Sequence, residues 1–389
     1  MALRADVPPP RRGFVVTGDI PSRRWSHIER LTATRPGFPI ERARPNGAQT
    51  DSEIVAAFGT ETPASRHALL HLGRGWETGT GVPVLLVHGA TVNAQYWHDP
   101  YGKPGRGLAP VLEAENFRFF AVSFAHRHGD NFVWAEMLNA AIARVRELTG
   151  APHVDVVAHS KGAFAARLLA SGLSQPWSTP YRGDIRRLVL IGAPNLGLDY
   201  PFRHPAINWG VFPERPDARL NAPMSWARTL VGGVWVNTDA YSLYHSGGNY
   251  FPGQAQMLHR WDDTYLLSNM GPDWKTTYHG GRGLVSVSRG IDRAIEQGGH
   301  LMARLREAPL DAGIELAVLG GDKADRPFFL NEYTGPSDGL VFVKSAMHTE
   351  DMTRGGAKLL AADVLPLNHG QLVYKTIAKR WIVETLRRP

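Results

Sequence analysis

A serine near the middle of the chain lies in a pattern that suits nucleophilic chemistry. Ser160 occurs in the stretch Ala158-His159-Ser160-Lys161-Gly162, between a β-branched run and an alanine-rich stretch with helical spacing. This order predicts a strand, a tight turn and a helix, with the serine hydroxyl exposed at the turn. Small residues are expected two positions before and after the serine, because larger side chains would collide with the facing backbone. We therefore interpret the stretch as a nucleophile elbow whose first glycine is replaced by alanine.

Patterns of this kind are short enough to occur by chance. Residues 284–290 also combine an apolar run, a serine at position 288 and a glycine before a helical pattern, and residues 244–248 match more loosely. Ser160 and Ser288 are therefore competing candidates. Ser160 is favoured if an acid and a histidine follow it in the chain, in the order that folds with an elbow use.

The histidine with the best position for a general base is His369. A serine hydroxyl is a poor nucleophile at neutral pH, so a histidine must accept its proton and a carboxylate must orient that histidine. His369 lies in a loop that leads directly into the last helical pattern, residues 371–386. His300 and His348 have weaker positions, because neither follows a terminal strand. His159 adjoins the nucleophile, but we expect its side chain to point away into the structure.

Two aspartates can serve as the acid. Asp338 lies in a turn at residues 335–339 and is followed by an apolar stretch. Asp322 stands closer to the end of the apolar run at residues 314–319 and could instead be a turn-forming residue. Either carboxylate could reach a histidine on the neighbouring loop, so both remain candidates at this point.

Two backbone amides are needed to bind the oxyanion of a tetrahedral intermediate. One is expected from Lys161, the residue after the nucleophile. The other is expected from Ala90, in the loop that follows the apolar run at residues 82–87. His88 and Gly89 open this loop, and the glycine allows the backbone to approach a substrate closely.

The elements that would position these residues alternate between apolar strands and helical patterns. Continuous apolar runs are typical of strands buried on both faces of a parallel sheet. Helical spacing occurs at residues 133–148 and again after Ser160. We therefore predict an α/β fold with a mostly parallel sheet flanked by helices. The predicted strands cover residues 66–72, 82–87, 117–124, 154–158, 187–192 and 314–319.

This alternation stops between residues 195 and 300, a segment rich in aromatic residues. We predict that residues 195–300 form a cap over the carboxyl edge of the sheet, where ligands bind in such folds. The core would comprise residues 63–194 and 301–389, with residues 1–62 wrapping its surface as an N-terminal extension. The aromatic residues of the cap would either bind a hydrophobic substrate or form the core of the cap itself. Its tryptophans are Trp209, Trp226, Trp235, Trp261 and Trp274.

The composition limits the classes of function. The chain has 389 residues, of which 43% are hydrophobic and 20% charged, as in an ordinary globular protein. Its net charge of +7 arises from scattered basic residues, so nucleic-acid binding is not expected. The absence of cysteine excludes disulfides and zinc–thiolate sites. Neither a signal peptide nor a membrane-spanning stretch is recognisable, which predicts a cytoplasmic protein unless a leader was removed.

A metal site is a separate hypothesis. His126 and His128 lie on one side of an extended segment, and Asp130 follows them. Alternatively, these residues line the pocket, or they cap the helix predicted from residue 133. We favour the two latter interpretations and predict neither a metal nor a cofactor.

The motifs resemble those of a known family, the bacterial lipases of the class-2 type, which have the α/β-hydrolase fold. Residues 158–162 look like the alanine-type elbow of small Bacillus lipases, and residues 368–374 are similar to their histidine loop. Residues 337–341 look like the acid loop of Burkholderia and Pseudomonas lipases, which favours Asp338 over Asp322. The resemblance covers residues 82–200 and 314–386.

Two departures from the larger lipases limit the resemblance. They carry a cysteine shortly after the acid loop, where this chain has Lys344. They also bind calcium through an aspartate two residues past the histidine, where this chain has Gln371, so calcium is not predicted. The cap matches neither subgroup.

The resemblance implies a carboxylic-ester hydrolase that acts through an acyl-enzyme. Ser160, His369 and Asp338 would be the nucleophile, the base and the acid, and the amides of Ala90 and Lys161 would bind the oxyanion. The expected partner is a hydrophobic ester or a lipid interface. Polyhydroxyalkanoate-type polyester cleavage, acyl transfer and a non-catalytic binding module on the same fold remain alternatives. The oligomeric state is left open.

Overall fold

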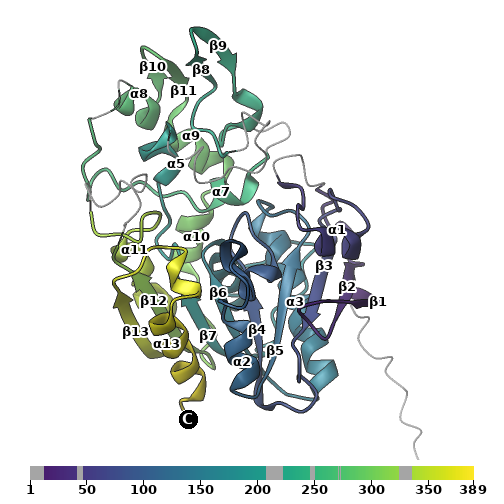
Figure 1. Ribbon diagram of the computed structural model, residues 1–389. Coiled ribbons are helices and arrows are strands. Elements are labelled where there is room, and N and C mark those ends of the chain that lie inside the picture. Colours follow the sequence, from purple (N-terminus) through teal and green to yellow (C-terminus); the bar gives the residue numbers. More distant parts are fainter. Residues whose placement is uncertain are drawn as a thin grey trace, which may run out of the picture.

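The structure is a computed structural model that describes residues 13–41, 47–206, 222–245, 250–269, 271, 273–323 and 335–389. Of the features named above, Trp209, residues 246–248 and parts of the N-terminal extension lie outside these ranges. Within them, a large α/β core carries a smaller group of helices and strands at one end (Figure 1).

A single sheet forms the centre of the core. Within the described residues its nine strands follow the order β1-β2-β3-β5-β4-β6-β7-β12-β13. The strands from β5 to β13 in that order run parallel, whereas β1, β2 and β3 are antiparallel to their neighbours. The strands are β1 (Phe14–Pro21), β2 (His27–Ala33), β3 (His67–Leu72), β4 (Thr80–Val87), β5 (Phe117–Phe124), β6 (Val154–His159), β7 (Ile185–Ile191), β12 (Glu315–Gly321) and β13 (Lys358–Leu365).

Helices cover both faces of this sheet (Figure 1). On one face, Trp134, Phe164 and Leu305 pack into the same hydrophobic cluster as the inward side chains of the strands. On the other face, Leu112 and Ile382 pack into a second hydrophobic cluster with side chains of the strands. The predicted fold class, a mostly parallel sheet flanked by helices, is confirmed. The helices of the core are α1 (Ser52–Phe58), η2 (Ala94–Trp97), η3 (Pro100–Gly102), α2 (Ala109–Ala114), α3 (Asn131–Thr149), α4 (Lys161–Ala170), α10 (Leu301–Glu307), α11 (Val343–Ala346), α12 (Glu350–Thr353), η6 (Gln371–Val373) and α13 (Thr376–Arg387).

The predicted strands of the core and the helix over residues 133–148 agree with the structure to within two residues at either end. The strand β13 was not predicted. It is an edge strand in which only Ala361 is buried, and its apolar run is limited to residues 359–362. The final helix predicted from residue 371 is divided, because η6 and a short break precede α13.

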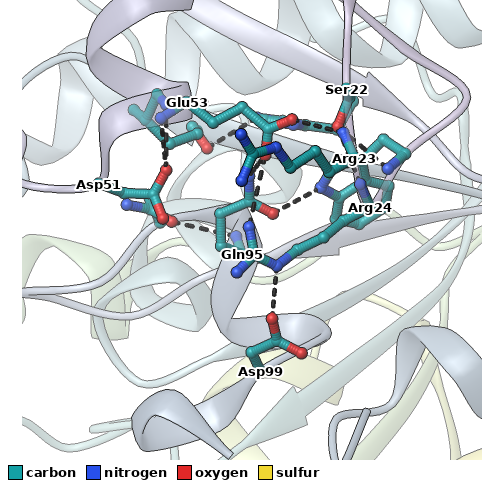
Figure 2. A network of polar contacts seen from close by, with 12 residues as sticks. Ser22, Arg23, Arg24, Asp51, Glu53, Gln95 and Asp99 are labelled. Atoms are coloured by element: carbon teal, nitrogen blue, oxygen red, sulfur yellow. Dashed lines mark hydrogen bonds and ion pairs between the residues drawn. The ribbon is translucent and has the colours of Figure 1, made fainter. Parts of the chain in front are cut away.

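The N-terminal extension does not only wrap the core, as the sequence suggested, but adds β1 and β2 to its sheet. Phe14 is the only buried residue of β1, which explains the weak pattern. The segment is also joined to the chain that follows β4. Figure 2 shows Arg24 contacting Asp99 and Glu53, while Gln95 donates a hydrogen bond to Glu53. The N-terminal residues thus brace the turn beyond β4.

Residues 195–300 contain a second, smaller sheet, with the antiparallel order β10-β11-β8-β9 among the described strands. We keep the name cap for this segment. In Figure 1, the four strands of this smaller sheet and the helices beside them lie beyond one end of the core. The elements are α5 (Tyr200–Arg203), β8 (Arg228–Val231), β9 (Val234–Asn237), η4 (Asp239–Tyr241), α7 (Pro252–Gln256), α8 (Trp274–His279), β10 (Gly281–Arg282), β11 (Ser286–Ser288) and α9 (Gly290–Gln297).

Most of the aromatic residues that the structure describes in the cap are buried. Tyr244, Phe251 and Tyr278 are buried in one cluster with residues of α5 and α9. Trp261 is also buried, whereas Trp235 on β9 is 37% exposed. The aromatic content therefore serves largely to give the cap its own core. Among the described residues, no helix combines the length and the apolar character needed to cross a membrane.

Candidate active site

The elbow begins where β6, a strand in the middle of the parallel sheet, ends. Ser160 lies between β6 and α4 with φ 55° and ψ −124°, a strained conformation for a residue with a side chain. Its backbone amide donates to the carbonyl of Ile191 at 2.9 Å. A Cβ atom on Gly162 would lie 2.2 Å from the carbonyl oxygen of His88, and Ala158 is fully buried. The small residues around the serine are therefore required by close packing.

A continuous hydrogen-bonded chain joins the three residues selected from the sequence. The hydroxyl of Ser160 lies 2.9 Å from Nε2 of His369, which can accept its proton. On the other side of the ring, Nδ1 of His369 lies 2.7 Å from Oδ2 of Asp338. Such an arrangement allows the imidazole to accept the serine proton while the carboxylate stabilises the resulting charge.

The acid and the base are held by their own loops. Oδ1 of Asp338 accepts hydrogen bonds from the amides of Leu340 at 3.0 Å and Val341 at 2.8 Å, so the fully buried carboxylate has one orientation. The amide of His369 donates to the carbonyl of Asp338 at 2.8 Å. This backbone contact joins the loop after β12 to the loop after β13, and thus sets the distance between the two side chains.

The competing candidates for the acid, the nucleophile and the base lie among other groups. Asp322 is exposed, and its amide donates to the carbonyl of Leu365, while the Nδ1 atom of His369 faces Asp338. The buried hydroxyl of Ser288 lies 2.7 Å from the carbonyl of Ser225 and accepts a hydrogen bond from the amide of Gly290. Of the weaker histidines, His348 lies against Asp351 at 2.8 Å, and His300 is the residue before α10.

The loop after β4 passes directly beside the elbow. A Cβ atom on Gly89 would lie 3.0 Å from Cβ of Ser160, so this glycine allows the loop to pass close to the elbow. The next residue, Ala90, is partly buried, and Arg127 donates to the carbonyl of Thr91 at 2.5 Å. Lys161 begins α4, and amides in the first turn of a helix have no acceptor within that helix.

The prediction for His159 was wrong in one respect. Its side chain does not simply point away from the nucleophile but packs against the base, with 4.7 Å between the ring centroids of His159 and His369. Its Nε2 atom lies 3.2 Å from the carbonyl oxygen of His369. Burial lowers the pKa of His159 well below its usual range, so the ring is neutral and Nε2 carries the donated proton. Strand alternation gave no signal of this contact, since it depends on a loop 210 positions further along the chain.

The segment that contains His126, His128 and Asp130 has a structural role. Asp130 accepts hydrogen bonds from the amides of Phe132 at 2.7 Å and Val133 at 3.4 Å and so caps α3, which confirms the predicted capping role. Nδ1 of His126 accepts from the amide of His128 at 3.0 Å. Within the described ranges, no group of three histidine or carboxylate side chains has the proximity needed to hold a metal ion.

The family follows from the comparisons with known proteins. Residues 84–357 match the Alpha/beta hydrolase family, and the chain belongs to this family. Its members are generally hydrolytic enzymes. A search of the curated proteins found no match.

Several solved structures are similar to this chain at low identity. A Bacillus licheniformis lipase in its mature form is 15% identical, with 82% of this chain and 97% of that chain covered and a TM-score of 0.48. A gene product from Listeria innocua is 15% identical, with coverage of 80% and 95% and a TM-score of 0.42. A thioesterase domain from the nocardicin cluster is 14% identical, with coverage of 82% and 98% and a TM-score of 0.35. These likenesses are too distant to bear on the reaction.

Proposed function

We propose that the protein is a serine carboxylic-ester hydrolase of the lipase or esterase type. The observation that carries the proposal is the position of His369, which lies within hydrogen-bond distance of both Ser160 and Asp338. A buried, oriented carboxylate on one ring nitrogen and a strained serine on the other suit nucleophilic catalysis better than a structural role.

In the proposed mechanism, Oγ of Ser160 attacks the carbonyl carbon of an ester while Nε2 of His369 accepts the hydroxyl proton. Asp338 stabilises the imidazolium through Nδ1. The proton then passes from His369 to the alcohol oxygen, the carbon–oxygen bond breaks, and the acyl group remains on Ser160. In the second half, His369 accepts a proton from water and the hydroxide adds to the acyl carbon. The bond between that carbon and Oγ of Ser160 then breaks, the acid is released, and His369 returns the proton to Oγ.

The amides of Ala90 and Lys161 are assigned to the oxyanion. The loop after β4 and the start of α4 both lie beside Ser160, and neither requires a side chain to supply a donor. Backbone donors of this kind are worth about 10²–10³-fold in kcat each. His159, which contacts the backbone of the His369 loop, is assigned a positioning role.

The acyl substrate is proposed from the resemblance to class-2 lipases rather than from the cap. Most of the aromatic residues described in the cap are buried, so they do not by themselves indicate a hydrophobic substrate surface. A hydrophobic ester, free or presented at a lipid interface, is the first substrate class to test. A polyester of the polyhydroxyalkanoate type is the second, because Trp235 offers an exposed aromatic surface that a polymer could contact.

The test combines covalent labelling with a substrate panel. A fluorophosphonate probe should label wild-type protein at Ser160, with loss of fluoride, and should not label Ser160→Ala. Hydrolysis of a long-chain triglyceride, a short soluble ester and a polyhydroxyalkanoate film would rank the substrates. Absence of both labelling and hydrolysis would overturn the proposal and favour a binding module on the same fold.

A further inference from the structure

The short helix α7 of the cap is bound tightly to the chain that precedes α3. The amide of Gly253 donates to the carbonyl of His128 at 3.2 Å, and the side chain of Asn131 donates to the carbonyl of Gly253 at 2.9 Å. The amide of Asn131 donates to Gln256 at 2.7 Å, and Gln254 lies 2.8 Å from Nδ1 of His128. All of these residues are buried. The cap is therefore fixed to the core at α7.

The side chain of Lys161 extends from the elbow to this same helix. It is fully buried, and its Nζ atom lies 3.3 Å from the ring centroid of Trp134 on α3. A Cβ atom on Gly253 would lie 2.3 Å from Cε of Lys161 and 2.3 Å from the carbonyl oxygen of Gly129. Only a glycine can occupy position 253 while α7 stays in contact with both neighbours.

The contact of Lys161 with α7 depends on packing rather than on an ion pair. Burial lowers the pKa of Lys161 well below its usual range, although the carboxyl groups of Asp130 and Glu41 oppose this shift. Among the described residues, the Nζ atom has no hydrogen-bond partner. The end of the side chain is thus held by the face of Trp134 and by the backbone of α7.

We propose that α7 is a fixed anchor of the cap and that it positions Lys161, whose backbone amide is the donor next to the nucleophile. The inference rests on the proposed function, since it concerns the oxyanion site of that reaction. The side chain of Lys161 begins at the elbow and ends against α7, so a shift of α7 removes one wall of its site. The first turn of α4 then loses the packing that orients the Lys161 amide. Gly253, Gln254 and Trp134 are positioning residues in this account.

The first test is Gly253→Ala, which forces α7 away from Lys161 and Gly129. We expect kcat on a soluble ester to fall about tenfold or more. This loss is smaller than the one expected when an oxyanion donor is removed, because the amide of Lys161 would be misplaced rather than lost. KM should change less than twofold, because the loss concerns the transition state. The labelling rate with the fluorophosphonate should fall by a similar factor. The downfield proton resonance of His369 bonded to Asp338 should remain, which separates this effect from a general disturbance of the site.

The matched control is Gly271→Ala, also in the cap. Apart from Gly271 itself and its two chain neighbours, no atom of the described residues lies within 4 Å of the position of a Cβ on Gly271. This variant should keep wild-type kcat within twofold. Hydrogen exchange provides an independent reading: the amide of Gly253 should exchange slowly in the wild type and in Gly271→Ala, but faster in Gly253→Ala.

If Gly253→Ala does not fold, Gln254→Leu gives a milder test, because it removes the contact with His128 while keeping a similar volume. We expect a fall in kcat of about threefold with faster exchange at α7. A variant in which α7 exchanges faster while kcat and labelling stay at wild-type values would overturn the inference but leave the proposed function intact. A wild-type protein that neither labels nor hydrolyses esters would instead overturn the proposed function.

Discussion

Two turns of this molecule share the order strand, serine, one residue, glycine and helix, but the structure uses them in opposite ways. Ser160 follows β6 in the middle of the parallel sheet, has a positive φ and directs its hydroxyl toward His369. Ser288 ends the three-residue strand β11 of the cap and directs its hydroxyl toward the carbonyls of Ser225 and Thr277.

The difference shows what makes a serine available for chemistry. At Ser160 the strained backbone lifts the side chain off the sheet edge, where loops from β12 and β13 bring an acid and a base. At Ser288 the hydroxyl completes hydrogen bonds between neighbouring segments of the cap. The same local pattern therefore gives a candidate nucleophile in one place and a structural link in the other, depending on what packs around it.

The largest expected effect separates the two serines by activity. Ser160→Ala should lower kcat on a reactive soluble ester by about 10⁴-fold or more, because the nucleophile is removed. Ser288→Ala should keep kcat within about twofold, as Ser288 takes no part in the chemistry. Initial rates normalised to the concentration of folded protein would measure both. Equal losses in the two variants would contradict the assignment.

The two aspartates offer a second contrast. Asp338→Asn should lower kcat by about 10³–10⁴-fold, because an amide cannot stabilise the imidazolium and favours the wrong tautomer of His369. Asp322→Asn, at an exposed position, should leave the rate unchanged. The comparison is made on folded protein at one pH. A large loss in Asp322→Asn alone would reverse the choice of acid.

The core that carries the Ser160 turn should be sensitive to acid. Burial lowers the pKa of His71 and of His88 to about 3, so both stay neutral in the fold while the unfolded chain binds protons below about 6.5. The stability that depends on the neutral state of these two histidines is thus present above that pH. It is lost as the pH falls toward their pKa in the folded protein. Each histidine contributes about 1.4 kcal/mol per pH unit of acidification.

The measurement is the free energy of unfolding by urea at several values of pH between 7 and 5. His71→Gln should reduce the slope by about one proton, or ~1.4 kcal/mol per unit, at pH values well below 6.5, and by less near pH 7, where the unfolded chain binds less than half a proton at this position. His71 lies away from the triad and bonds to Ser123 at 2.9 Å, so the variant reports on stability rather than on catalysis. An unchanged slope would show that His71 titrates alike in both states.

The smallest expected effect completes the comparison of the turns. Ser288→Ala removes a buried hydroxyl and leaves the amide of Gly290 without its acceptor, which should cost about 1–3 kcal/mol of unfolding free energy. Urea unfolding followed by tryptophan fluorescence, which includes the buried Trp226 and Trp261 of the cap, would detect it. A neutral result would mean that Ser288 is not the structural link described above.

Much of the core could be predicted from the sequence, because its strands are buried on both faces. β5 was predicted with its observed bounds, and the elbow around Ser160 was recognised from small residues at fixed spacing. Edge elements were harder. β1 and β13 each bury a single residue, so local composition carried little sign of them, and only pairing with their neighbours makes them strands.

The sequence by itself determined the types of the candidate reacting groups and their order along the chain: a serine in a tight turn, then two possible acids, then His369. The resemblance of its loop favoured Asp338 over Asp322, and only the tertiary structure shows that the loop of Asp338 meets the imidazole. Only the tertiary structure, too, brought His159 against His369 and Gly253 against Lys161. Such contacts join segments far apart in the chain, and they arise from packing, which local patterns do not record.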